Sequence, residues 1–166
     1  MAKAKMALNG YFLGSTLCKE ELGILYAHLN QTEHSLPTLT VHAPLLRVYW
    51  LPLDQYRFVI QKKATPFTEA LLGPYREKNF ALVQLRIQSL LTNIEVRAKK
   101  GIVNTDSNLV RNFAFFGDTA VEIDFGNYAY SPWLLEGEKW REEQWRYKKR
   151  LRLFQQHYMP DLEVTW

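Results

Sequence analysis

The sequence predicts an α+β fold, with a small N-terminal antiparallel sheet followed by a mostly helical half. Three observations indicate this class. Residues 39–63 contain three short runs rich in β-branched and aromatic side chains, residues 80–100 follow a helical repeat, and residues 137–159 form a second helical stretch. A chain of 166 residues, 47% of them hydrophobic, is long enough to bury one core, so we expect one domain over residues 1–166.

Two helices are predicted to flank three strands in the first half of the chain. Residues 19–30 place apolar side chains on one helical stripe, which predicts an amphipathic helix that ends near Asn30. After Pro66, the Gly73-Pro74 pair allows only a short or a broken helix. The predicted strands are separated by turn residues and lie at residues 39–43, 46–51 and 56–63.

The second half is predicted to hold two longer helices and a hairpin. Residues 80–100 are the most regular helix, because apolar side chains recur at helical spacing from Val83 to Ala98. A polar loop then leads into a hairpin with Gly117-Asp118 at its turn. The last helix ends before Pro160, and Glu142 and Glu143 are assigned to its solvated face. Its predicted apolar face consists of Trp140, Tyr147, Leu151, Phe154 and Tyr158.

Charge and composition narrow the class of protein. The net charge is +4, a modest excess that favours an anionic partner without identifying one. No apolar run approaches the roughly 20 residues that cross a bilayer, and Asn9 and Gly10 interrupt the short apolar stretch near the N-terminus. We therefore expect no transmembrane segment, no secretory signal and a cytoplasmic location.

The number and spacing of cysteine and histidine residues do not indicate a structural metal site. The single Cys18 cannot form an internal disulfide, and no Cys/His cluster has the spacing of zinc ligands, which fits a reducing compartment. We expect Cys18 to be a buried small apolar residue. The histidines are scattered and suggest neither a metal pair nor a nucleophile–base dyad: His28, His34, His42 and His157.

The best candidate site residue is Asp124, which closes the β-like run VEIDFGNY at residues 121–128. Taken alone, an Asp and a following Gly at a strand end are ordinary turn residues. The loop NTDSNLVRN, residues 104–112, adds Asp106 and Asn112 directly after the long helix. Because the intervening hairpin returns the chain, we expect Asp124 to lie near that loop.

The order of long helix, loop with Asp and Asn, two short strands and Asp-Phe-Gly resembles the catalytic half of the protein-kinase-like superfamily. The loop NTDSNLVRNFAFF is similar to that of the toxin–antitoxin serine/threonine kinases. The larger set YAHLNQTE, YRFVIQKKATP and EIDFGNY is similar to kinase-like proteins of chlamydia-related bacteria, a similarity that bears on fold more than on activity. The resemblance implies a truncated kinase-like fold, with a remnant N-lobe near residues 1–63 and a reduced helical C-lobe at residues 64–166.

This resemblance also implies roles for individual residues. Asp106 would accept the proton of the substrate hydroxyl, while Asn112 and Asp124 would hold magnesium against the phosphates of ATP. The strand at residues 56–63 would run into the segment that contacts adenine, which places Gln61, Lys62 and Lys63 near the nucleotide. The alternative for these three residues is an ordinary strand end with solvated lysines.

Several positions depart from the kinase pattern. Asn112 follows Asp106 by six residues instead of five, so the loop must bulge to restore the geometry. No G-x-G-x-x-G occurs, and Gly10 and Gly14 are the glycines nearest to where a phosphate flap would lie. Glu20 or Glu21 would supply the glutamate of the regulatory helix, with Lys3 or Lys5 as its partner.

The sequence therefore predicts a degenerate kinase-like protein that binds nucleotide and magnesium with weak or absent phosphotransferase activity. One alternative is a minimal active serine/threonine kinase. Another is a non-catalytic interaction module that presents the aromatic and basic terminal helix, with Trp145 and residues 148–152, to a protein partner. Nucleic acid is a less favoured partner for that helix, because acidic residues interrupt its basic face.

Overall fold

The structure is a computed structural model that describes residues 2–164, with side chains from residue 4 onward. Over these residues it contains five helices and several small antiparallel sheets of two or three strands. This architecture confirms the predicted α+β class. The division into two lobes near residue 63 stays a prediction.

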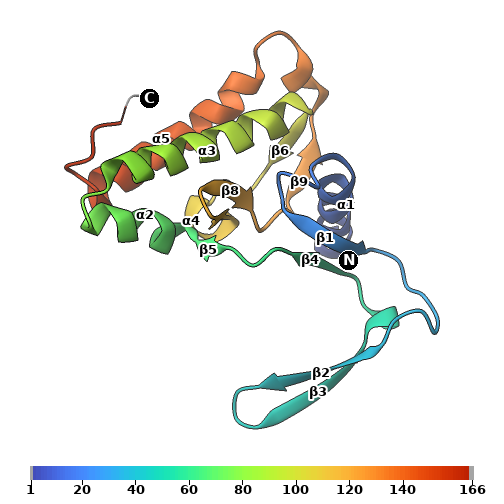
Figure 1. The fold of residues 1–166 in the computed structure, drawn as a ribbon. Coiled ribbons are helices and arrows are strands. Elements are labelled where there is room, and N and C mark those ends of the chain that lie inside the picture. Colours follow the sequence, from blue (N-terminus) through green and yellow to red (C-terminus); the bar gives the residue numbers. More distant parts are fainter. Residues whose placement is uncertain (1, 165–166) are drawn as a thin grey trace.

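The larger core lies between three helices and a short sheet. Helix α3 (Phe80–Lys99) and helix α5 (Trp140–Tyr158) lie side by side, and helix α2 (Phe67–Arg76) packs against α3 (Figure 1). The helices predicted at residues 80–100 and 137–159 are thus confirmed, because their apolar stripes face this core. Its buried side chains include Phe67, Ile87, Leu90, Phe113, Tyr147 and Leu151.

Helix α2 passes through Pro74 without breaking. Proline has no N–H, so the carbonyl of Ala70, one turn earlier, loses its helical partner. The Arg86 guanidinium on α3 donates to that carbonyl at 2.6 Å and pairs with the Asp118 carboxylate at 3.0 Å. The short helix predicted after Pro66 is therefore confirmed, as one continuous helix of ten residues.

The strands of the described chain form four separate antiparallel sheets. In these sheets β1 (Ile24–His28) pairs with β4 (Phe58–Gln61), β2 (Thr38–Ala43) with β3 (Arg47–Pro52), β7 (Phe113–Phe116) with both β5 (Thr65–Pro66) and β8 (Thr119–Glu122), and β6 (Ile102–Asn104) with β9 (Tyr128–Tyr130). Short helical turns occur at η1 (Leu53–Gln55), α4 (Leu109–Asn112) and η2 (Pro132–Leu135). The three strands predicted between residues 39 and 63 are confirmed, as is the hairpin that turns at Gly117-Asp118.

The helix predicted at residues 19–30 is wrong. Residues 19–23 form a turn that ends at Gly23, whose φ is +60°, and the chain continues as strand β1. Two members of the predicted stripe, Leu25 and Tyr26, are 56% and 43% exposed. The local helical pattern is overridden because β1 pairs with β4, a distant segment that the helical repeat does not take into account.

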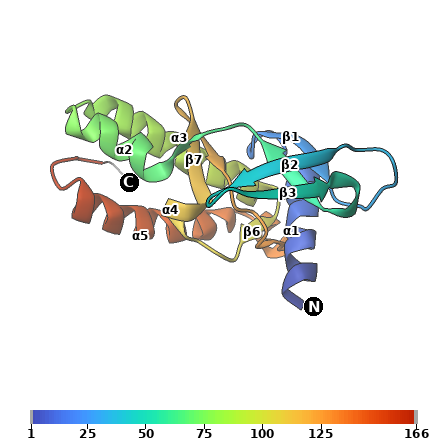
Figure 2. The same ribbon diagram turned by 90° about the horizontal axis from the view of Figure 1, so that it is seen from below.

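A helix that the sequence analysis did not predict, α1 (Ala2–Leu17), precedes this turn. It stands at the end of the molecule opposite α2 (Figure 2). A second buried cluster lies beside it, in which Cys18 is fully buried, as predicted. The cluster also holds Leu22, Ile24, Ile102, Phe125 and Tyr128.

Within the described residues, none of the helices is both long enough and apolar enough to cross a membrane.

Candidate functional site

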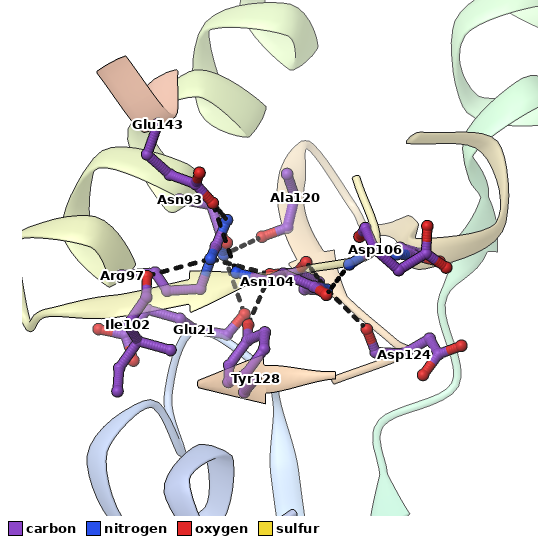
Figure 3. A network of polar contacts seen from close by, with 12 residues as sticks. Glu21, Asn93, Arg97, Ile102, Asn104, Asp106, Ala120, Asp124, Tyr128 and Glu143 are labelled. Carbon is purple, nitrogen blue, oxygen red and sulfur yellow. Dashed lines mark hydrogen bonds and ion pairs between the residues drawn. The ribbon is translucent and has the colours of Figure 1, made fainter. Parts of the chain in front are cut away.

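The site is organised around Asn104, the last residue of β6, whose side chain is fully buried. Its Oδ1 accepts a hydrogen bond from the Asp106 main-chain N–H at 3.0 Å. Its Nδ2 donates to the main-chain oxygen of Asp124 at 3.1 Å and to the Glu122 carboxylate at 2.7 Å. One amide side chain therefore joins the loop that carries Asp106 to the segment that carries Asp124 (Figure 3).

The loop between Asp106 and Asn112 contains one helical turn, α4. The Asp106 Oδ1 accepts from the Asn108 N–H at 3.1 Å, and the Asn108 side chain in turn caps α4 by accepting from the Arg111 N–H. This turn leaves the Arg111 side chain 75% exposed and brings Asn112 into the interior with no exposed surface. The six-residue interval between Asp106 and Asn112 thus contains the helical turn α4.

Asn112 is bonded to both neighbouring segments. Its Nδ2 donates to the Asp106 main-chain oxygen at 2.7 Å, and its own main-chain oxygen accepts from the Ile123 N–H at 2.7 Å. Its remaining polar atom, Oδ1, is buried and has no hydrogen-bond partner among the described residues. A buried amide oxygen without a partner costs free energy unless a donor or a cation satisfies it.

Asp124 is exposed and follows Glu122 and Ile123 at the end of β8. Figure 3 shows the Asp106 and Asp124 carboxylates at the same end of the polar network, both pointing away from Arg97. Tyr11 on α1 lies near Asp124. Burial raises the pKa of the Tyr11 hydroxyl, and the negative charge of Asp124 raises it further.

Helix α1 packs directly on the Asp-Phe-Gly segment through its two glycines. A Cβ at Gly10 would lie 2.6 Å from the Phe125 main-chain oxygen, and one at Gly14 would lie 2.8 Å from Cε2 of the Phe125 ring and closer still to its Cδ2. The rings of Tyr11 and Phe125 meet edge to face at a centroid distance of 5.0 Å. Gly10 and Gly14, considered above as flap residues, instead allow close helix packing.

A cavity of about 450 Å³ adjoins the site. Its walls come from α1, from β4 and from the two residues that flank Asp124, namely Ile123 and Phe125. Apolar side chains predominate, with Arg57, Gln61 and Tyr11 as its polar groups. A mostly apolar cavity beside a few polar groups is the usual form of a small-molecule site.

The predicted nucleotide contacts separate in space. Gln61 lines the cavity, and its Nε2 donates to the main-chain oxygens of Leu22 at 2.9 Å and Glu122 at 3.1 Å. Lys62 is exposed, and its Nζ lies 5.0 Å from the Phe116 ring centroid on the β7–β8 hairpin. Lys63 is exposed on the link toward β5. Of the three residues, Gln61 therefore contacts the segment that leads into Asp124, whereas the Lys62 ammonium lies against the hairpin.

Beneath the site lies a buried ionic network centred on Arg97 of α3. The Arg97 guanidinium forms ion pairs with Glu122 at 3.1 Å and with Glu143 at 3.0 Å, and it donates to the Ile102 main-chain oxygen at 3.1 Å. Glu143 also pairs with Arg146 at 2.8 Å. The assignment of Glu143 to a solvated face was wrong, because the need of Arg97 for a counter-charge draws this carboxylate inside.

Glu122 connects that network to the site. Its carboxylate accepts from the Tyr128 hydroxyl at 2.5 Å as well as from Asn104. Burial raises the pKa of the Glu122 carboxyl, against the opposing effects of Arg97 and these hydrogen bonds. Burial works against the Arg97 charge too, but Glu122 and the surrounding groups raise its pKa overall. Asn104 is thereby held by a charged, desolvated cluster.

This network was not predicted from the sequence, although the sequence contains one signal of it. Arg97 lies three residues after Ile94 and seven after Leu90, so it falls on the apolar stripe of α3. A charged residue on the buried face of a helix requires a partner from elsewhere in the fold. Glu122 and Glu143 carry no comparable signal, because their burial depends on the packing of β8 and α5 against α3.

The other expectations about individual residues have mixed outcomes. Residues 19–23 form a turn, so Glu20 and Glu21 do not lie on a helix, and Glu21 pairs with Lys100 at 2.5 Å. The Lys3 side chain lies outside the described residues. On α5, Tyr147, Leu151 and Phe154 are buried as predicted, but Tyr158 is 50% exposed.

The donor set suits magnesium better than a transition metal. The side chains from residue 4 to residue 164 contain no group of three or more His, Cys, Asp or Glu residues placed to hold a metal ion. Magnesium is commonly held by one or two carboxylates together with the phosphates of a substrate. The orphaned Asn112 Oδ1 and the exposed Asp124 carboxylate are hard oxygen donors of that kind.

Comparisons with protein-family models, with curated proteins and with solved structures found no match to this chain.

Proposed function

We propose that this chain is a degenerate kinase-like protein that binds a magnesium–nucleotide complex at Asp106, Asn112 and Asp124. The observation that carries the proposal is the buried Asn112 Oδ1 without a partner, in an amide whose nitrogen is already bonded to Asp106. A magnesium ion beside Asp124 would satisfy that oxygen. The element order α3, loop, β7–β8 hairpin and Asp-Phe-Gly supports the same proposal, since the kinase-like resemblance is based on this order.

The three residues would have separate roles. Asn112 Oδ1 and the Asp124 carboxylate would hold the ion, which when bound neutralises the charge of the nucleotide phosphates. Asp106 would position an acceptor hydroxyl and take its proton. Its Oδ1 is held by the Asn108 N–H, and its Oδ2 has one 4.0 Å ion pair, with Arg111, among the described residues. Asn104 and the Arg97 network would fix the distance between the two aspartate segments.

The adjoining cavity suits the base of the nucleotide. Its volume of about 450 Å³ and its apolar walls, which include Leu8, Phe58 and Val59, fit a planar aromatic group. Gln61 supplies a polar contact at the wall. Arg57 donates from Nε to the Leu29 main-chain oxygen, which leaves its terminal nitrogens for an anion.

We expect the phosphotransferase activity of this chain to be weak or absent. The groups that the resemblance assigns to a phosphate clamp are engaged elsewhere: Glu21 pairs with Lys100, and the two glycines of α1 pack on Phe125. Positioning of the phosphates is the main requirement of phosphoryl transfer, so its loss reduces rate more than binding. The buried free Cys18 is compatible with the cytoplasmic location that forms part of this proposal.

The test of binding is the melting temperature of the full chain with ATP, with magnesium and with both. We expect a rise that requires both, because a ligand that binds only the folded state stabilises it. Asp124→Asn should abolish the rise. Asp118→Asn, a matched change at an exposed aspartate on the hairpin turn, should retain it. No rise at millimolar nucleotide would overturn the proposal.

Transfer is tested separately with radiolabelled ATP. Little or no label on the chain or on a generic substrate is expected. Efficient labelling that Asp106→Ala abolishes would favour the minimal active kinase instead. Labelling that survives Asp106→Ala would refute the role given to this residue.

A non-catalytic interaction module is the second candidate, and one observation favours it. The outer face of α5 exposes Trp145 by 63% and Leu153 by 61%, with Lys148, Lys149 and Arg152 around them. Tryptophan and arginine side chains are enriched in protein interfaces. Two results together would favour the interaction module over the nucleotide-binding protein. The melting temperature of the parent chain would not rise with nucleotide and magnesium, and a protein partner that binds the parent chain would not bind Trp145→Ser.

A further inference from the structure

The β2–β3 hairpin extends away from the rest of the molecule (Figure 1). Its strands pair with each other from Thr38↔Pro52 to Ala43↔Arg47, and none of their residues is buried in the part of the chain that the structure describes. A two-stranded hairpin by itself is only marginally stable in water. Its apolar side chains therefore serve neither core in this structure, and they need an explanation outside the fold.

The tip of the hairpin is unusual in conformation and in exposure. Leu45 and Leu46 have φ values of 64° and 57°, in the left-handed region that favours glycine and asparagine. Their side chains are 84% and 99% exposed. A turn with this backbone conformation would be more stable with glycine or asparagine at these two positions. We therefore infer that the leucines contact an apolar medium outside the fold.

Apolar side chains cover both faces of the arm behind the tip. Tyr49 is 47% exposed and Trp50 is 69% exposed. Consecutive strand residues point to opposite faces, so these two rings lie on opposite sides of the ribbon. A groove on a protein would cover one face and leave the other in water. A medium that surrounds the tip from all sides would cover both.

The charges of the arm favour an anionic surface. Between Thr38 and Pro52 there is no acidic residue, whereas Arg47 is exposed directly beside the tip and His42 lies on the facing strand. The whole chain carries a net charge of +4. Arginine and lysine near an apolar anchor are attracted to anionic lipid headgroups.

We propose that the β2–β3 hairpin docks on an anionic phospholipid bilayer by inserting Leu45 and Leu46 into its surface. The Tyr49 and Trp50 rings then lie at headgroup level, where aromatic side chains are enriched. Trp50 lies four residues beyond Leu46, about 13 Å along an extended strand. This separation lets the leucines reach the acyl boundary, about 5–10 Å deep, while Trp50 stays in the polar region. The proposal is independent of the nucleotide site.

The test is co-sedimentation of the full chain with phosphatidylcholine vesicles that contain or lack phosphatidylserine. Binding is expected with phosphatidylserine and should weaken with salt. The double variant Leu45→Asn/Leu46→Gly places residues suited to positive φ at the tip, so the hairpin should fold at least as well as in the parent. Its vesicle partition should fall at least about tenfold, because burial of one leucine is worth more than that factor.

Control variants distinguish insertion of the hairpin tip from nonspecific adsorption through other exposed leucines. Leu85→Ser and Leu153→Ser remove leucines that are 54% and 61% exposed on α3 and α5, and binding should persist. Arg47→Gln should weaken binding to phosphatidylserine vesicles only. The proposal is overturned by a parent chain that binds neither vesicle, or by equal binding of the tip variant. It is also overturned if size-exclusion chromatography shows a dimer that the tip variant dissociates, since the hairpin would then be a protein interface.

Discussion

The Asn112 side-chain amide donates to the main-chain oxygen of Asp106 at 2.7 Å, across an interval of six residues. The relationship depends on α4, which turns Arg111 outward and Asn112 inward. The Asp106 main chain and the Asn112 amide are thereby held together, and the amide oxygen has no hydrogen-bond partner among the described residues.

Replacement of Asn112 by leucine should lower the free energy of unfolding by about 1–2 kcal/mol, because the Asp106 carbonyl loses its donor. Urea denaturation measures the change. The neighbouring Arg111→Leu, at an exposed position, should stay within about 0.5 kcal/mol of the parent. Equal effects of the two substitutions would contradict the buried role of Asn112.

Replacement of Gly14 by alanine should destabilise the chain by about 1–3 kcal/mol, because the added methyl group overlaps the Phe125 ring. Amide hydrogen exchange of α1 should be faster in this variant than in the parent, because the added methyl group displaces the helix from the Asp-Phe-Gly segment. Gly73→Ala in α2 is the matched control. Nothing lies within 4 Å of its added Cβ, so a gain of about 0.5–1 kcal/mol is expected. Unchanged exchange across α1 in the Gly14 variant would count against this packing.

Replacement of Arg97 by methionine should cost about 3–5 kcal/mol, because Glu122 and Glu143 would be left buried without their counter-charge. Arg141→Met removes an exposed pair with Glu138 and should cost no more than about 0.5 kcal/mol. Chemical denaturation of both variants measures the contrast. The double variant Arg97→Met/Glu122→Gln should recover part of the loss, and strict additivity of the two changes would argue against direct coupling.

Cys18 should make stability fall in alkaline solution. Burial raises the pKa of its thiol from 9.0 to about 11, so the folded chain holds the proton more tightly than the unfolded chain does. The associated stability is fully present below about pH 9 and is lost as the pH rises toward about 11, by about 1–2 kcal/mol. Urea denaturation across this range should show a steeper decline for the parent than for Cys18→Ala. Parallel declines would exclude the thiol as the cause.

Much of the fold was predictable because its signals are local. The stripe of α3 and the Gly117-Asp118 turn each depend on residues a few positions apart. The failure at residues 19–30 has the opposite cause, since β1 exists through its pairing with β4. Helix α1 escaped prediction because its glycines weaken the helical pattern, and their value lies in contact with Phe125 and Gly126.

The candidate site divides in the same way. By itself the sequence determined the α+β class, the helices α3 and α5, and the order of Asp106, Asn112 and Asp124 along the chain. These features depend on periodicity and turn residues, which involve only neighbouring positions. Three features depended on the tertiary structure alone. Asn104 joins the Asp106 and Asp124 segments, and the buried Arg97–Glu122 ion pair lies next to Asn104. Gly10 and Gly14 let α1 pack closely on Asp-Phe-Gly. Burial and partnership of polar groups depend on which elements meet in space, and that is set by packing rather than by local pattern.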